Sequence, residues 1–353
     1  MMLSLFHNST FHTEVTNYEC LIKISFYQPY LQIGLLLGGF LRVCYNFKMN
    51  AITVTNIVKK YGKVTAINGT SFTVEAGSFF ALLGTNGAGK STTISCLTTI
   101  LPPSSGEIRV NGRLIGQDND EIRREIGVVF QKSLLDDLLT VRENLDSRAQ
   151  FYDIADPAKA IQDLAKLLEL KDFLDQRYGT LSGGQKRRAD IARALIHKPK
   201  ILFLDEPTAG LDPESRHSVW KTIKNLQETT NLTVFLTTHY MQETEQAHQV
   251  CIMHKGTIIA QGTPQTLRAE FSHDQLRLVP KDMAHMESVL LKRSLTAIRE
   301  ADSLLVNTDD SQQAMELLHD YRANITDFEY VHGNMDDVFL NLTNSSEMNK
   351  VTS

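Results

Sequence analysis

The stretch "GTNGAGKST" at residues 84–92 constrains the fold of this chain more than any other. It follows a short apolar run, "FFALLG", and precedes a helical pattern over 90–101 that Pro102 and Pro103 end. A strand, a loop of the form GxxxxGK[ST] and a helix, in this order, place backbone N–H groups and a helix N-terminus around a phosphate. The stretch therefore predicts a phosphate-binding loop. Its expected members are Gly84, Thr85, Asn86, Gly87, Ala88, Gly89, Lys90, Ser91 and Thr92.

Short apolar strands alternate with helical segments from residue 50 onward, which predicts a mainly parallel sheet with both faces covered. The expected strands of this sheet lie at 79–84, 126–131, 200–207, 231–239 and 250–262. Residues 51–78, together with a hairpin at 107–115 around an Asn-Gly turn, predict a small antiparallel sheet. Residues 134–178 carry apolar residues at helical spacing and predict a helical insert. We expect an α/β fold with a P-loop core, an antiparallel β subdomain and a helical subdomain at about 132–190.

Polar side chains stand at the ends of two of the expected strands. Asp205 and Glu206 follow "ILFL", and His239 follows "TVFLTT". Ligands of open α/β sheets bind at the carboxyl ends of the strands, so these side chains are expected at the phosphate-binding loop. We expect Lys90 to reach the β- and γ-phosphates and Ser91 and Asp205 to bind Mg²⁺. Glu206 is the expected general base, and His239 is expected to contact the γ-phosphate.

Two further positions leave alternatives open when read from the residues alone. Gln131 ends the strand 126–131 just before the helical insert. Its amide is placed to touch Mg²⁺ or the attacking water, or it is an ordinary polar residue at a strand exit. Tyr61, in "KKYGK", either stacks on an adenine ring or is an exposed aromatic residue near a turn.

A second glycine turn opens the helical pattern "LSGGQKRRADIARAL" at 181–195. Ser182, Gly183 and Gly184 offer a hydroxyl and bare N–H groups at a helix N-terminus, which favours an anion. The simpler interpretation is a plain N-cap, with Ser182 capping the helix and the glycines serving the turn.

Composition limits the function classes. The 353 residues carry a formal net charge of −5, which gives no electrostatic case for a nucleic-acid partner. The four cysteines are scattered without a CxxC pair and indicate neither a zinc site nor a disulfide framework. The best candidate for a membrane span, residues 30–41, is shorter than the ~18–20 apolar residues that a spanning helix needs.

The pattern divides the chain into three parts. Residues 1–48 lack clear periodicity, and we expect a mis-called translation start or an unstructured leader, the alternative being an interfacial anchor around 30–41. Residues 49–267 form the expected nucleotide-binding domain. Residues 268–353 predict a small α+β unit with strands at 275–279, 303–307 and 325–331, expected to serve dimerisation or regulation.

Taken together, these motifs resemble the nucleotide-binding subunit of an ATP-binding cassette (ABC) transporter over roughly residues 50–265. Residues 84–92 resemble its Walker A loop, "LSGGQ" its signature, "ILFLDEP" its Walker B strand and "AGLD" at 209–212 its D-loop. The resemblance implies a RecA-like core that binds ATP and Mg²⁺. It assigns Tyr61 to adenine stacking, Gln131 to Mg²⁺ and His239 to the switch position. Thr85 departs from the family, which often has proline there.

The same resemblance implies a head-to-tail homodimer in which the signature of one copy covers the ATP of the other. The signature residues are Ser182, Gly183, Gly184 and Gln185, and Asp212 of the D-loop is expected at the contact between copies. "LLTVRENL", "KRRADIARAL" and "MDDVFLNLT" are similar to the drug- and antibiotic-export branch. That branch implies separate membrane subunits of the ABC-2 type and a place on the inner face of the cell membrane.

Other function classes remain alternatives. A soluble cassette ATPase of translation usually has two cassettes, and one of DNA repair has a long coiled coil, whereas neither feature is present here. A P-loop kinase or GTPase leaves "LSGGQ" unexplained. An importer ATPase is the remaining alternative within the transporters.

Overall fold

The computed structural model describes residues 15–16, 19–20, 49–308 and 310–351. The chain divides into two units, residues 1–47 and 48–353. Within the first unit, β1 (Val15–Thr16) pairs with β2 (Glu19–Cys20). The remaining residues of 1–48, for which we expect a leader or a mis-called start, lie outside the described residues.

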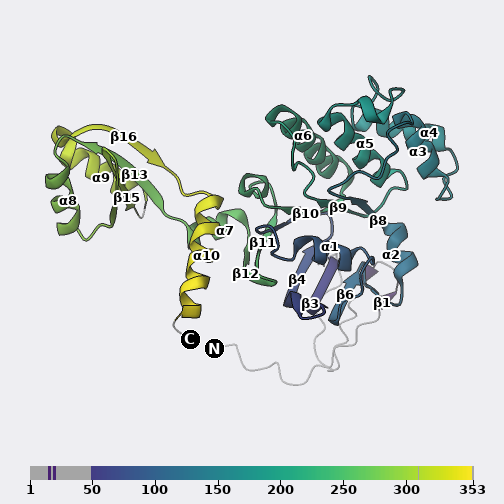
Figure 1. The fold of residues 1–353 in the computed structure, drawn as a ribbon, viewed down its shortest axis with the longest axis horizontal. Coiled ribbons are helices and arrows are strands. Elements are labelled where there is room, and N and C mark those ends of the chain that lie inside the picture. The colour runs from purple at the N-terminus through teal and green to yellow at the C-terminus, as the bar shows by residue number, and fades with distance from the viewer. Residues whose placement is uncertain (1–14, 17–18, 21–48, 309, 352–353) are drawn as a thin grey trace, which may run out of the picture. The chain divides into compact units, whose positions relative to one another are not determined.

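A six-stranded sheet with the order β12-β11-β5-β10-β9-β8 forms the centre of the second unit (Figure 1). Its strands are β5 (Phe79–Leu83), β8 (Ile126–Val129), β9 (Ile201–Asp205), β10 (Thr233–Thr238), β11 (Gln249–His254) and β12 (Thr257–Gly262). Only the β11–β12 pairing within this sheet is antiparallel, so the prediction of a mainly parallel sheet is confirmed.

The sheet separates two apolar layers because successive side chains of a strand face opposite sides. Phe79, Ala81 and Leu83 pack with α3 (Val141–Ala149), α4 (Pro157–Leu167), α5 (Gly183–Leu195) and α6 (Pro213–Thr230). Phe80 and Leu82 pack with α1 (Lys90–Leu97) and the antiparallel sheet β4-β3-β6-β7. The antiparallel strands are β3 (Asn50–Tyr61), β4 (Val64–Glu75), β6 (Ser105–Val110) and β7 (Arg113–Leu114). Helices α1 and α5 therefore lie on opposite faces of the central sheet.

Local backbone chemistry shifts several predicted boundaries. Helix α1 ends at Leu97 and not near residue 101, because Thr99 adopts a left-handed conformation with φ 63°. Helix α4 ends at Leu167 and not at 176, shortly before Glu169 with φ 54°. The sequence reading also missed α2 (Asn119–Glu125).

Residues 274–331 form a second, four-stranded antiparallel sheet with the order β14-β15-β13-β16. Its elements are β13 (Asp274–Pro280), α8 (Met283–Lys292), β14 (Ala297–Glu300), β15 (Ser303–Thr308), α9 (Ser311–Tyr321), η3 (Arg322–Asn324) and β16 (Ile325–Val331). The two helices and the sheet share a core of their own. The sequence predicts three of these four strands. It does not predict β14, which has only four residues; three of them are exposed, so the strand lacks an apolar pattern.

The last helix, α10 (Met335–Val351), packs against the nucleotide-binding part of the unit. It contacts α7 (Pro264–Phe271) and the 3₁₀ turn η2 (Met241–Thr244), and its Met335, Val338 and Phe339 join the core of the central sheet. The predicted boundary at residue 268 groups these residues with the small α+β unit, and this division stays a prediction. Within the described residues, no helix is long and apolar enough to cross a membrane.

Candidate ATP-binding and hydrolysis site

The phosphate-binding loop connects the buried strand β5 to the start of α1, as predicted. Two glycines hold backbone conformations that favour glycine, Gly87 with φ 80° and Gly89 with φ 109°. A Cβ on Gly89 would lie 2.5 Å from the carbonyl oxygen of Ala66, so the β3–β4 hairpin closes directly over the loop. No side chain caps the N-terminus of α1, which leaves its amide groups available to an anion.

Lys90 lies buried at the centre of this loop, with 4% of its surface exposed. Its Nζ donates to the carbonyl oxygens of Gly84 at 2.8 Å and Thr85 at 3.1 Å. The same ammonium group is 3.1 Å from Glu206 Oε1. The loop lysine and the expected general base are thus in direct contact, although they are 116 positions apart in the sequence, 206 − 90.

Asp205 ends β9 beside the first residues of α1. Its Oδ1 accepts hydrogen bonds from Thr237 Oγ1 at 2.6 Å and from Ser91 Oγ at 3.4 Å. Burial raises the pKa of Asp205, an effect that the Thr237 hydrogen bond opposes in part. The described residues hold no group of three or more His, Cys, Asp or Glu side chains suited to a metal. One carboxylate and one hydroxyl nevertheless fit Mg²⁺, which usually binds through one or two carboxylates together with substrate phosphates.

The raised pKa of Asp205 predicts a pH-dependent gain in stability for Asp205→Asn. Ionising the buried carboxyl costs more in the folded than in the unfolded chain, so the native protein loses stability as pH rises through the raised pKa. Asparagine keeps an acceptor for Thr237 and Ser91 but stays neutral. We expect the variant, without nucleotide, to melt above the wild type at pH 8, with a smaller difference at pH 5, and to lose stabilisation by Mg-ATP. Thermal unfolding checks this, with the exposed Asp302→Asn as control; a lower melting temperature at pH 8 would contradict it.

Glu206 and His239 lie side by side at the carboxyl ends of the parallel strands β9 and β10. His239 Nδ1 lies 3.2 Å from Glu206 Oε2, although the two groups are not aligned for a hydrogen bond. Glu206 has φ 45°, an uncommon conformation for a residue with a side chain, and its N–H donates to the carbonyl oxygen of Thr237 at 3.1 Å. The carboxylate is therefore held between the lysine of the loop and the histidine, with 9% of its surface exposed.

Gln131 follows β8, and Tyr61 ends β3. The pairing of Val129 with Leu204 places Gln131 and Glu206 at equivalent positions beyond their parallel strands. Tyr61 is 47% exposed and belongs to the hairpin that closes over Gly89. Both side chains are exposed, so their roles toward a nucleotide stay predictions.

The second glycine turn caps α5. Ser182 Oγ accepts from the N–H of Gln185 at 3.3 Å, and Gln185 Oε1 accepts from the N–H of Ser182 at 2.9 Å. This is a capping box, so the hydroxyl of Ser182 does cap the helix, as the simpler interpretation expected.

Gly183 and Gly184 also serve close packing against the start of α6. A Cβ on Gly183 would lie 2.8 Å from Leu211, and one on Gly184 would lie 3.1 Å from Ser215. Asp212 caps α6 by accepting from the N–H of Ser215 at 2.9 Å. The turn and Asp212 are therefore neighbours within one chain.

Comparisons with known proteins decide the family. The family profile described as ABC transporter matches residues 67–209. The chain is 37% identical over 305 residues to the daunorubicin/doxorubicin resistance ATP-binding protein DrrA of Streptomyces peucetius, covering 83% of this chain and 92% of the relative. The chain belongs to the ABC transporter family. Among its members, the Nod factor export ATP-binding protein I of Burkholderia thailandensis is 36% identical over 298 residues, covering 83% of this chain and 96% of the relative. The linearmycin resistance ATP-binding protein LnrL of Bacillus subtilis is 36% identical over 301 residues, covering 82% and 96%.

Solved ABC transporter cassettes share the fold. A dimeric structure of the ATP-binding cassette MJ0796, bound to ADP and Pi, has a TM-score of 0.55 and 29% identity, covering 60% of this chain and 98% of that one. The cbiO1 subunit of Clostridium perfringens has a TM-score of 0.59 and 29% identity, covering 69% and 97%. The chain is accordingly an ABC transporter ATPase, and its α/β P-loop fold with an antiparallel β subdomain is confirmed.

The sequence reading missed two residues that connect Gln131 of this ABC transporter ATPase to the signature helix α5. Arg187 donates to the carbonyl oxygens of Phe130 at 2.7 Å and Gln131 at 3.2 Å. Asp190 Oδ2 lies 4.0 Å from Arg187 Nη1. Oδ1 of the same carboxylate accepts a hydrogen bond from Ser133 Oγ at 2.5 Å. Burial lowers the pKa of Arg187 and raises that of Asp190. In the sequence both resemble the charged surface of a helix, and only their neighbours in space show otherwise.

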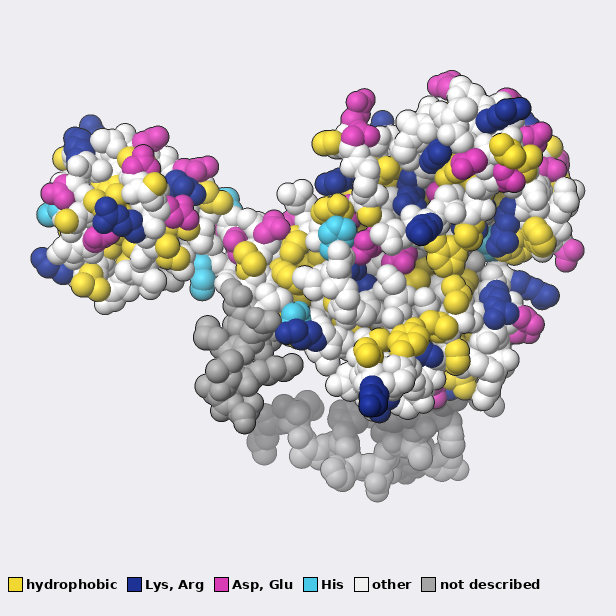
Figure 2. Space-filling model, viewed as in Figure 1, with side chains coloured by type: hydrophobic (Ala, Val, Ile, Leu, Met, Phe, Trp, Pro, Cys, Tyr) yellow, Lys and Arg dark blue, Asp and Glu magenta, His cyan; other side chains and the backbone are white. Residues whose placement is uncertain are grey.

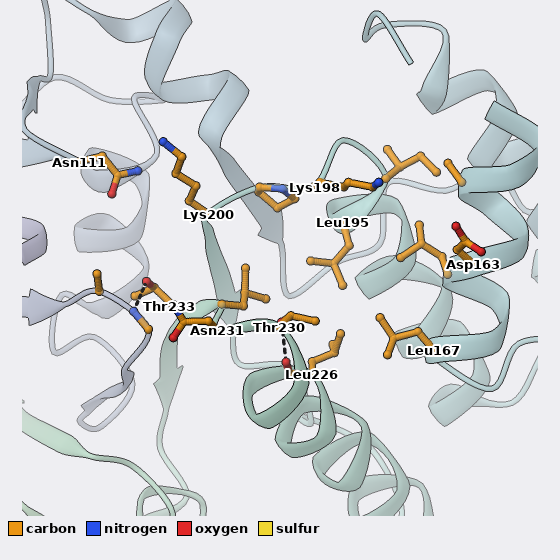
Figure 3. A pocket seen from close by; sticks show the side chains of 17 residues that line it. Asn111, Asp163, Leu167, Leu195, Lys198, Lys200, Leu226, Thr230, Asn231 and Thr233 are labelled. Carbon is orange, nitrogen blue, oxygen red and sulfur yellow. Dashed lines mark hydrogen bonds between the residues drawn. The ribbon is translucent and has the colours of Figure 1, made fainter. Parts of the chain in front are cut away.

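A cavity of about 560 Å³ lies at the other end of the strands (Figure 3). Leu167, Leu195 and Leu226 point into it from α4, α5 and α6, and Lys200 and Thr233 line it at the starts of β9 and β10. At the opposite ends of these strands, Asp205 ends β9 and His239 follows β10. The cavity is therefore separate from the ATP site of the transporter ATPase.

Proposed function

We propose that the cluster around Lys90 and Glu206 binds and hydrolyses Mg-ATP. The contacts of Glu206 with both Lys90 and His239 carry this proposal. They bring the phosphate-binding loop, the carboxyl end of β9 and the carboxyl end of β10 together at one point. Lys90 and the loop amides bind the phosphates. Ser91 and Asp205, with Gln131, would hold Mg²⁺, which offsets phosphate charge when bound. Glu206 accepts a proton from the attacking water, His239 contacts the γ-phosphate and Tyr61 stacks on the adenine ring.

The second glycine turn acts on the ATP of another copy. Helices α1 and α5 lie on opposite faces of the central sheet, which supports a role for Ser182–Gln185 outside the site of its own chain. Asp212, beside this turn, would lie at the contact between copies. The dimeric MJ0796 cassettes support the same arrangement, a head-to-tail homodimer.

The chain drives export of drugs, antibiotics or similar amphiphiles through separate membrane subunits of the ABC-2 type. Its relatives are named for resistance to daunorubicin, doxorubicin and linearmycin and for Nod factor export. Leu134, Leu138 and Phe151 of the helical insert are 63%, 77% and 76% exposed, and we propose them as apolar contacts for these membrane subunits. We therefore expect the protein to act on the inner face of the cell membrane. Figure 2 shows acidic and basic side chains interspersed on one face of the molecule. A nucleic-acid-binding surface is typically a patch of basic side chains, so this face does not support a nucleic-acid partner.

Cellular accumulation of fluorescent amphiphiles tests the direction of transport. Cells lacking the gene are compared with cells that carry the wild type or Glu206→Gln. We expect higher accumulation in the deletion strain and no restoration by Glu206→Gln. Lower accumulation in the deletion strain would favour an importer. Absence of the native protein from washed membranes would favour a cassette ATPase without a transport role.

A further inference from the structure

A buried carboxyl group lies behind the catalytic cluster and was not singled out by any motif. Glu243 belongs to η2, the turn that follows His239. It is 6% exposed, because η2 packs against β5, β10 and α10.

Three hydrogen bonds converge on this carboxyl group. Oε1 accepts from Thr208 Oγ1 and from Trp220 Nε1, the latter at 3.2 Å, while Oε2 accepts from Thr238 Oγ1. Thr208 and Thr238 are themselves almost fully buried. A buried donor without an acceptor is costly, so each partner is held where the carboxyl group lies.

Two of the three donors come from the segments that carry the catalytic side chains. Thr208 belongs to the turn after Glu206, whose Ala209 N–H donates to the Glu206 carbonyl oxygen at 3.2 Å. Thr238 directly precedes His239, and its carbonyl oxygen accepts from the N–H of Gly84 in the phosphate-binding loop at 3.2 Å. One carboxyl group therefore ties together the ends of β9 and β10.

We propose that Glu243 is a positioning residue for ATP hydrolysis, which sets the distance between Glu206 and His239 through Thr208 and Thr238. The inference rests on the roles proposed for Glu206 and His239. Catalytic groups need to be held within about 0.5 Å of productive geometry. The left-handed conformation of Glu206 is uncommon and persists only where its surroundings hold it, which the Thr208 contact helps to do.

Glu243→Ala and Glu243→Gln test this role in the full chain. Alanine removes both acceptor oxygens and with them all three hydrogen bonds, and we expect kcat to fall at least tenfold while the KM for ATP changes less than threefold. Glutamine keeps the shape and one oxygen, so its kcat should lie between those of alanine and wild type. Glu245→Gln is the matched control: Glu245 lies two residues further on, is partly exposed and pairs with Arg268, and its change should leave kcat within twofold.

Trp220 is the only tryptophan of the chain and reports the contact directly. Because its indole N–H donates to Glu243, its fluorescence emission should shift in both variants. Thr238→Val, which removes one hydroxyl donor at nearly constant volume, gives the same test should alanine at 243 prevent folding; it should lower kcat without raising KM, and its effect should not add to that of Glu243→Gln.

Two results would overturn the inference. One is a shifted Trp220 emission with kcat unchanged, which would mean that the contact breaks without consequence. The other is a lower melting temperature with unchanged kcat per folded molecule, which would assign Glu243 to stability alone. Glu206→Gln, measured in parallel, separates the two proposals: if it hydrolyses ATP normally, the proposed site fails, whereas if it is inactive and Glu243→Ala is normal, only the present inference fails.

Discussion

Replacing Glu206 by glutamine should lower ATP hydrolysis at least a hundredfold and convert the chain into a stable ATP-bound dimer. Glutamine occupies the same volume between Lys90 and His239 and leaves the phosphate-binding loop intact, so ATP still binds. It cannot accept a proton from water, and general-base catalysis contributes about 10²–10⁴-fold to rates. The substitution therefore separates binding and dimerisation from hydrolysis. Steady-state ATPase rates, together with size-exclusion chromatography in Mg-ATP, measure both results.

The matched control is Glu228→Gln, a change at an exposed glutamate of α6 that pairs with Lys224. It should hydrolyse ATP at the wild-type rate. A Glu206→Gln protein that binds ATP but remains monomeric would contradict ATP-driven dimerisation. Wild-type hydrolysis by Glu206→Gln would instead remove Glu206 from the role of general base.

The sequence predicts the phosphate-binding loop well because all its determinants are local. A buried strand, glycines that tolerate positive φ and a helix start are adjacent in the chain, and the structure joins them in the expected order. Asp205, Glu206 and His239 were predictable for a related reason. Each ends or directly follows a buried parallel strand, and the carboxyl ends of such strands share one edge of the sheet.

The supporting contacts could not be predicted in the same way. Arg187 and Asp190 occupy helical positions that suit solvent, yet the start of the helical insert folds over them and buries both. Glu243 lies in a single 3₁₀ turn, which is too short to show a periodic pattern of apolar residues. Its hydrogen-bond partners come from three separate segments of the chain. In each case the determining contact joins residues far apart in the sequence, and the residue type alone indicates an exposed charge.

Replacing Ser182 by arginine should abolish hydrolysis while leaving ATP binding to the single chain within twofold of wild type. Arginine removes the hydroxyl and places a long side chain on the surface proposed to cover the ATP of the other copy. It also removes the capping box with Gln185, which costs about 1 kcal/mol of stability. Ser182→Ala and Thr140→Ala, which remove N-caps from α5 and α3, measure that stability cost by itself. Thr140→Ala should keep the wild-type rate.

Mixing the two inactive proteins tests directly whether Ser182 acts on the partner's ATP. In a mixed dimer, the Ser182→Arg chain supplies an intact Glu206 and the Glu206→Gln chain supplies an intact Ser182. If the signature acts across the dimer, these two groups form one complete site, and the mixture should hydrolyse ATP at least tenfold faster than either protein alone. If the signature acts within its own chain, both sites of the mixed dimer stay defective and mixing restores nothing. Combining the chains before ATP is added avoids trapping Glu206→Gln as its own dimer, so a mixture that remains inactive would contradict the shared site.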